Sequence, residues 1–295
     1  MIYDLSLMIA YDYADAVNDA RHVLRVRPRL EPGQRPGPVK VSIDPKPDEI
    51  IRDRDFFGNA LDHLLILPAH DALTVTMRTR VEVERERPAL DRTPAVRELV
   101  ALARSSRDPG GGGPMHFLGA SRMVRAAEPF TAYAAKSMAP DRPVGEAVFE
   151  LARRIKAEFD YAPGATTVDT PVEEAFAKRE GVCQDFAHVM IAALRGVGVP
   201  AAYVSGFLRT EPPPGQKRLE GADAMHAWIQ AWLGPQTGWI GFDPTNAMLA
   251  LDDHVTVAVG RDYGDVAPID GTVMTSGDQK THHAVDVKPV ELAEA

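Results

Sequence analysis

The chain has 295 residues, and its apolar fraction of 45% is typical of a folded globular protein rather than a disordered one. Its 33 basic and 42 acidic side chains give a net charge of −9, which disfavours nucleic acid as a partner. The first residues, MIYDLSLMIAYDYAD, carry acids where a secretory signal carries Lys or Arg, and no stretch approaches the roughly 20 apolar residues of a membrane span, so we expect a cytoplasmic protein without a membrane partner.

The first third of the chain has the pattern of antiparallel β-structure. Residues 73–86, LTVTMRTRVEVERE, alternate apolar and polar side chains, and this period of two predicts a long strand with one buried face. Residues 22–30 and 39–44 repeat the pattern in shorter runs between turns rich in Pro and Gly. The sequence therefore predicts a small antiparallel β-domain, to which we assign residues 1–92.

From Thr93 the apolar spacing changes to that of helices. In TPAVRELVALAR, Thr93 is a candidate N-cap with Pro at the first helical position. Residues 142–159 have apolar side chains spaced by three or four, which predicts a second helix. A third helix is expected after Thr170, which forms a candidate capping box with Glu173.

A helix and several strands are predicted in the second half of the chain. The helix runs from about Cys183 to Leu194 and is followed by strands in residues 201–208, 225–233 and 237–246. Helices followed by strands indicate an α+β domain with an antiparallel sheet.

We assign residues 93–295 to this second domain, with its core at about 155–250. The polar and Pro-rich segment of residues 209–224 is expected to border its cleft.

Cys183 is the single cysteine of the chain, so no internal disulfide and no CxxC zinc pair can form. A helix that begins at Cys183 places the sulfur near unpaired N–H groups and the positive end of the helix dipole. Such a position favours the nucleophilic thiolate. The alternative is that Cys183 is a buried small hydrophobic residue, which is the usual state of a free cysteine.

His226 and Asp243 are the candidate partners of Cys183. A cysteine nucleophile needs a histidine to take its proton and a third group to orient the imidazole. A hairpin through GPQTG would place the two residues side by side, on the sheet face that we expect to meet the helix of Cys183. The alternatives are a satisfied core histidine for His226 and the start of an Asp-Pro turn for Asp243.

His188 is a second candidate base, but it lies five residues along the same helix and should point away from the sulfur. A metal site formed by Cys183, His188 and His226 lacks a recognised ligand spacing.

Three stretches resemble the core of the bacterial transglutaminase-like superfamily, whose Cys, His and Asp motifs occur in this order: GVCQDFAHVMIAALRGVGVPAAYVSGFL, DAMHAWIQAWL and GWIGFDPTN. YDYADAVNDARHVLRVRPR and DFFGNALDHLLIL resemble the β-domain that precedes this core, and VAVGRDYGDVAPIDG resembles the segment that follows it. The resemblance implies a papain-like fold, in which a cysteine helix packs on an antiparallel sheet.

Carried over by position, the resemblance implies that Cys183 is the nucleophile, His226 the general base and acid, and Asp243 the orienting carboxylate. The Cys183 N–H is a candidate oxyanion donor. The implied activity is that of a cysteine protease or amidase that cleaves peptide or carboxamide bonds of a protein or peptide substrate through a thioester.

Two alternatives share the residues of this site. Transfer of the acyl group to an amine, as in a transglutaminase, uses the same three side chains, although the resemblance to bacterial two-domain relatives favours hydrolysis. A non-catalytic peptide-binding or assembly module is the alternative of another class, and the presence of all three residues disfavours it. The sequence has no recognisable calcium loop, so we expect no metal and no cofactor.

Overall fold

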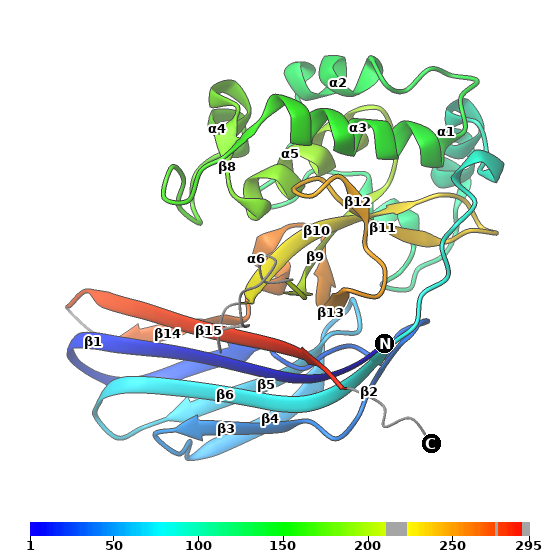
Figure 1. Cartoon of the computed structure of the whole chain (residues 1–295). Helices are drawn as coiled ribbons and strands as arrows, with labels where there is room; N and C mark the ends of the chain where they lie inside the picture. The colour runs from blue at the N-terminus through cyan, green and yellow to red at the C-terminus, as the bar shows by residue number, and fades with distance from the viewer. Residues whose placement is uncertain (211–222, 275–276, 291–295) are drawn as a thin grey trace, which may run out of the picture.

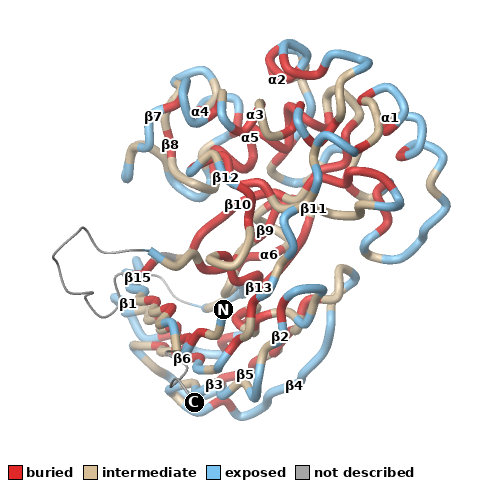
Figure 2. Tube along the Cα trace, turned by 45° about the vertical axis from the view of Figure 1, so that its right-hand side comes forward, coloured by how far each residue is buried: buried red, intermediate tan, exposed pale blue. Residues whose placement is uncertain are grey.

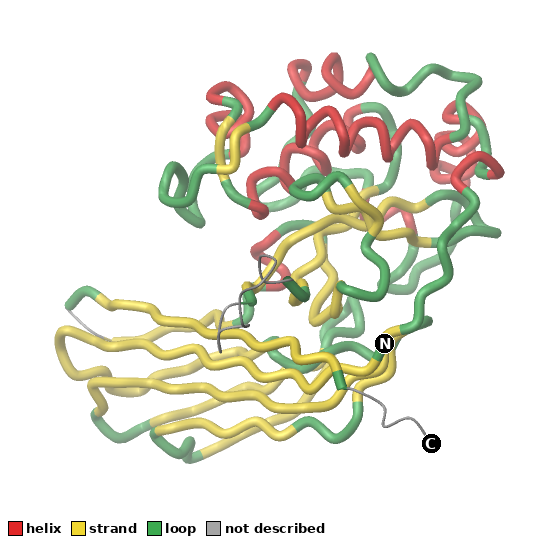
Figure 3. Tube along the Cα trace, viewed as in Figure 1, coloured by secondary structure: helices red, strands yellow, loops and turns green. Residues whose placement is uncertain are grey.

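The computed structural model describes residues 1–210, 223–274 and 277–290. A helical layer covers one side of a central sheet, and a larger sheet lies below (Figures 1 and 3). The described part of the chain contains no helix long and apolar enough to cross a membrane. Most of the predicted cleft segment, residues 209–224, lies outside the described residues.

The larger sheet contains eight strands: β1 (Ile2–Leu24), β2 (Gln34–Pro36), β3 (Lys40–Asp44), β4 (Glu49–Arg54), β5 (Ala60–Ile66), β6 (His70–Val83), β14 (Ile269–Met274) and β15 (Gln279–Pro289). Strand β1 is central to this sheet. Its first half pairs antiparallel with β6 and β15, and its second half pairs with β5 and β14. The predicted long strand corresponds to β6, and the predicted strand 39–44 corresponds to β3.

The C-terminal strands β14 and β15 therefore complete the N-terminal sheet, although the sequence pattern places their residues in the second domain. Their pairing with β1 joins segments that are more than 240 residues apart, and no local pattern encodes such a partner. The boundary between residues 92 and 93 stays a prediction.

The second part of the fold contains the remaining elements: the 3-10 helices η1 (Leu90–Arg92) and η2 (Pro114–Phe117), the helices α1 (Val96–Ser105), α2 (Glu128–Ala135), α3 (Val144–Glu158), α4 (Val172–Lys178), α5 (Cys183–Gly196) and α6 (Tyr263–Val266), and the strands β7 (Asp160–Tyr161), β8 (Glu180–Gly181), β9 (Ala201–Leu208), β10 (Ala224–Trp232), β11 (Trp239–Asp243), β12 (Met248–Leu249) and β13 (His254–Gly260). The central sheet has the strand order β12-β11-β10-β9-β13, with antiparallel neighbours. This architecture confirms the predicted α+β fold with a papain-like core and a preceding β-domain.

Helix α5 lies inside the helical layer and is buried along most of its length (Figure 2). It packs against α2, α3, α4 and β10, and the side chains between them form one apolar core. A helix that is apolar around most of its circumference is stable when other elements surround it. The start of α5 is therefore held at a fixed place relative to the sheet.

Two buried amide side chains of the N-terminal domain fasten the larger sheet to β13, which is an edge strand of the central sheet. Gln34 accepts a hydrogen bond from Thr256 N–H (2.7 Å) and donates one to Thr256 O (2.8 Å). Asn59 makes the same pair of bonds with Val259 N–H and O, both at 2.8 Å. An unpaired edge has free backbone donors and acceptors, and these amides satisfy part of that edge.

The two predicted helix caps are wrong. Thr93 donates to Leu90 O and accepts from Gly145 N–H, so it holds the start of α3 rather than the start of α1. Thr170 accepts from Thr167 N–H and thus closes a local turn instead of capping α4. In both places a Thr hydroxyl satisfies a neighbouring backbone group, which is a frequent alternative to capping.

Candidate active site

Helix α5 begins at Cys183, as the sequence predicts, and the Cys183 side chain is half-buried. The carboxylate of Asp185 fixes this helix start, because its Oδ2 accepts from Val182 N–H (2.8 Å) and from the Thr166 hydroxyl (2.6 Å). Gly181 has a φ of +158°, and a Cβ at this position would lie 2.6 Å from Asp185 Oδ2. The backbone that leads into Cys183 therefore requires glycine at residue 181.

His226 and Asp243 lie together, as the sequence predicts. His226 Nε2 donates to Asp243 Oδ2 at 2.8 Å, with 9% of His226 and none of Asp243 exposed. Because Oδ2 of a carboxylate accepts only, the bond leaves Nδ1 as the ring nitrogen available to the Cys183 thiol.

Asp243 is held by several donors besides His226. Its Oδ1 accepts from the backbone N–H groups of Thr245 (2.9 Å) and Asn246 (3.1 Å), and its Oδ2 also accepts from Asn246 Nδ2 (2.8 Å). Burial of the carboxyl raises its pKa, but the hydrogen bonds and charges of His226 and His254 lower the pKa well below its ordinary value. Asp243 is therefore a fixed anion.

The pKa of His226 responds to both neighbours. Burial, the largest single effect, lowers it, but the hydrogen bonds to Asp243 and Cys183, and then the charges of these two groups, raise the pKa to about 10. The site thus favours the imidazolium form, which is the state that a thiolate partner requires. The structure brings all three predicted residues together, while their catalytic roles stay predictions.

For most of β10, the face that packs against α5 is not the face that the sequence predicts. Ala227, Ile229 and Ala231 belong to the core that β10 shares with α5, whereas Trp228 belongs to a second cluster on the other face. His226 shares the face of Trp228, and its ring lies 6.1 Å from the indole ring. His226 meets Cys183 where β10 and α5 begin, and not on the face of the sheet that α5 covers.

His188 is a core residue in this structure. Only 2% of it is exposed, its Nε2 accepts from Tyr263 N–H (3.2 Å), and its ring packs 5.0 Å from that of Tyr203. Burial lowers its pKa to about 4. The prediction that it is not the base agrees with this position.

Two tyrosines near the thiol were not identified from the sequence. Burial, followed by the charge of Cys183, raises the pKa of both Tyr161 and Tyr203. Tyr161 is exposed, and Tyr203 is buried. No motif marks either residue, since their proximity to the thiol depends on the packing of β7 and β9 around α5.

His254 is a further residue that no sequence motif revealed. It is fully buried, and its Nε2 lies 3.1 Å from the same Asp243 Oδ2 that His226 contacts. In the described residues, His226, Asp243 and His254 form the one group whose ligand atoms are close enough for a metal ion. We assign them to hydrogen bonding instead, because both imidazole nitrogens lie at hydrogen-bond distance from one carboxylate oxygen.

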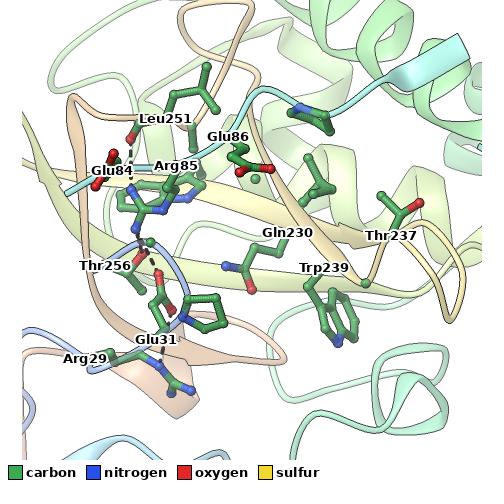
Figure 4. Close-up of a pocket in the computed structure, with 18 residues that line it drawn as sticks. Arg29, Glu31, Glu84, Arg85, Glu86, Gln230, Thr237, Trp239, Leu251 and Thr256 are labelled. Carbon is green, nitrogen blue, oxygen red and sulfur yellow. Dashed lines mark hydrogen bonds and ion pairs between the residues drawn. The ribbon is translucent and has the colours of Figure 1, made fainter. Parts of the chain in front are cut away.

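A cavity of about 720 Å³ lies on the face of the central sheet that carries Trp228 (Figure 4). Trp228, Gln230 and Trp239 line it from the sheet, and Arg85 lines it from the segment after β6. Neither Cys183 nor its two partners line this cavity. The two tryptophans therefore border a space beside the candidate active site rather than around the thiol.

Comparisons with known proteins agree with the fold. The family model "Transglutaminase-like superfamily" matches residues 131–244, and the model "Bacterial transglutaminase-like N-terminal region" matches residues 3–82. The protein Rv2569c of Mycobacterium tuberculosis (strain ATCC 25618 / H37Rv) is 36% identical over 293 residues, which cover 98% of this chain and 93% of that protein. The chain belongs to the transglutaminase-like superfamily.

Two further similar proteins, one found by sequence and one by structure, have names that describe an activity. A protein-glutamine gamma-glutamyltransferase of Pseudomonas aeruginosa is 33% identical over 103 residues, 32% of this chain and 15% of that protein. The crystal structure of a candidate cysteine protease from Cytophaga hutchinsonii has a TM-score of 0.73 at 19% identity, and the match covers 99% of this chain and 95% of that chain. At this identity, the structural likeness shows the fold alone.

Proposed function

We propose that this protein is a cysteine-nucleophile enzyme that cleaves peptide or carboxamide bonds through a thioester. The observation that supports the proposal most is the His226–Asp243 pair beside Cys183, with a 2.8 Å hydrogen bond between a buried imidazole and a buried carboxylate. The substrate class is a protein or peptide, and the reaction uses no metal and no cofactor.

The first half of the proposed reaction forms the acyl-enzyme. The Cys183 thiolate attacks the carbonyl carbon, and the carbonyl oxygen becomes an oxyanion near the Cys183 N–H. As the first residue of α5, Cys183 has an N–H that no preceding helical turn can pair. His226 then donates its proton to the leaving amine, the C–N bond breaks, and a thioester remains on the sulfur.

The second half decides between two activities. Water activated by His226 attacks the thioester and releases an acid, which makes the protein a protease or amidase. This is our primary proposal, and the name of the Cytophaga hutchinsonii structure is consistent with it. An amine in place of water gives acyl transfer, and the glutamyltransferase of Pseudomonas aeruginosa makes this the second candidate.

One isotope-labelling experiment tests both activities. A proteolytic digest of casein, which offers many peptide and glutamine carboxamide bonds, is incubated with the protein in H₂¹⁸O, with and without a primary amine such as cadaverine. Hydrolysis gives new ¹⁸O-labelled carboxylates whether or not the amine is present, whereas acyl transfer gives amine adducts in their place.

The variant Cys183→Ala is the control for the labelling experiment. Products that form equally with the variant would refute Cys183 as the nucleophile. Binding of digest peptides without any product would support a non-catalytic binding or assembly module instead.

A further inference from the structure

His254 stands at the start of β13 and is fully buried behind Asp243. Its Nε2 lies 3.1 Å from Asp243 Oδ2, an oxygen that also accepts from His226 Nε2 and Asn246 Nδ2, both at 2.8 Å. Three donors thus share one carboxylate oxygen.

The surroundings fix the protonation of His254. Because Asp243 is an anion and can only accept, the shared hydrogen bond requires a proton on His254 Nε2. His254 Nδ1 is buried and has no partner within the described residues, so nothing stabilises a second proton there. Burial, the largest effect, lowers the pKa of His254. His254 is therefore a neutral imidazole with its proton on Nε2.

The charged and titratable groups that face His254 come from two strands and one connecting segment. They are Asp243 on β11, His226 on β10 and Arg85 after β6. Arg85 Nη1 donates to the backbone oxygen of His254 at 2.6 Å, and the ring of Trp228 packs edge-on against the imidazole at 5.0 Å. The backbone and the ring of His254 are thus both held in place, so its Nε2–H keeps a fixed direction toward Asp243.

We propose that His254 is a positioning residue that acts through Asp243: its hydrogen bond to Oδ2 limits how strongly the carboxylate accepts from His226 Nε2 and stabilises the imidazolium. The physical reason is that the hydrogen bond from His254 stabilises the carboxylate anion and lowers its pKa, and a less basic carboxylate accepts less strongly from its other donors. The inference rests on the proposed function, because a less stabilised imidazolium gives its Nδ1 proton to the leaving amine more readily.

Substitutions at His254 separate this role from a packing role. Glutamine can present an amide N–H near the position of Nε2, whereas the shorter asparagine places its amide near Nδ1 and cannot reach Oδ2. His254→Gln should therefore retain the donor, and His254→Asn should lose it at similar polarity. His254→Phe removes all polar groups, and His22→Phe, at a buried histidine of β1 in the N-terminal sheet, is the control for general destabilisation.

The low-field proton NMR signal of His226 Nε2–H, assigned by its loss in His226→Ala, reports the hydrogen bond to Asp243 without requiring turnover. We expect this signal to move to lower field in His254→Asn and His254→Phe, and to stay near the wild-type position in His254→Gln and His22→Phe. An unchanged signal in folded His254→Asn would overturn the inference, even if Cys183 proves reactive.

Turnover of the casein digest gives the functional readout. Cleavage should be about tenfold slower in His254→Asn than in His254→Gln, because an imidazolium that Asp243 stabilises more strongly is a weaker Nδ1 acid toward the leaving amine. Equal rates in these two variants would contradict the inference. An unreactive wild-type thiol would contradict the proposed function while leaving the NMR result on His254 intact.

Discussion

Replacement of Asp243 by asparagine keeps the size of the side chain and removes its charge. The pKa of His226 is about 10 in the folded protein and 6.5 ordinarily, a difference of about 3.5 units that corresponds to about 5 kcal/mol. A raised folded-state pKa means that the stabilisation is fully present below pH 6.5 and is lost as the pH rises through 10. Asp243→Asn removes the partner whose hydrogen bond raises this pKa most, so a large part of the stabilisation should vanish.

The same substitution leaves hydrogen-bond donors without an acceptor. Oδ2 accepts from His226, His254 and Asn246, whereas an amide nitrogen at that place cannot accept. A buried donor that loses its partner costs about 1–3 kcal/mol, so we expect a loss of at least about 3 kcal/mol in unfolding free energy at pH 6.5.

Urea denaturation at pH values from 6.5 to 9.5 measures both effects. The wild-type unfolding free energy should fall across this range, and that of Asp243→Asn should start lower and stay nearly constant. Asp262→Asn is a matched control, because Asp262 is also buried and accepts two backbone N–H bonds, from Met123 and Gly264. It should lower stability without removing the pH dependence. An equal slope in Asp243→Asn and wild type would refute this account of His226.

Three further predictions concern single residues. Cys183→Ala should abolish turnover of the casein digest. In urea denaturation at pH 6.5 it should lower the unfolding free energy by less than Asp243→Asn does, because the half-buried thiol is the weaker of the two partners that raise the pKa of His226. Burial lowers the pKa of His188 to about 4, so the wild-type unfolding free energy should fall as the pH falls from 6.5 toward 4. In His188→Leu, urea denaturation over this pH range should show a smaller fall. Gly181→Ala should destabilise the protein by about 2 kcal/mol and slow alkylation of Cys183, because a Cβ would meet the Asp185 carboxylate. Gly119→Ala is the control: it has open space around it, so stability and alkylation rate should both stay unchanged.

Local patterns predicted the elements that carry the candidate site. The apolar spacing after Gly181 placed a helix start at Cys183, and the predicted strand 201–208 has the bounds of β9. The hairpin that joins the strands of His226 and Asp243 was also predicted, because a short turn fixes the pairing of its two strands.

Features that depend on long-range pairing were not predicted. His254 lies in a strand whose position is set by pairing with β9 and by the amides of Gln34 and Asn59, and none of these partners is close in sequence. The prediction of which face of β10 meets α5 was wrong for a related reason. Alternation of apolar and polar residues divides a strand into two faces, but it does not say which face another element covers.

The alkylation rate of Cys183 by iodoacetamide at pH 6, in wild type and His226→Ala, tests the central claim most directly. At this pH an ordinary thiol with a pKa near 8.5 is almost fully protonated and reacts slowly. We predict that wild-type Cys183 reacts at least about tenfold faster than a cysteine in an unfolded peptide, and that His226→Ala loses this advantage. Slow alkylation in wild type, or equal rates in both proteins, would contradict the claim that His226 activates Cys183.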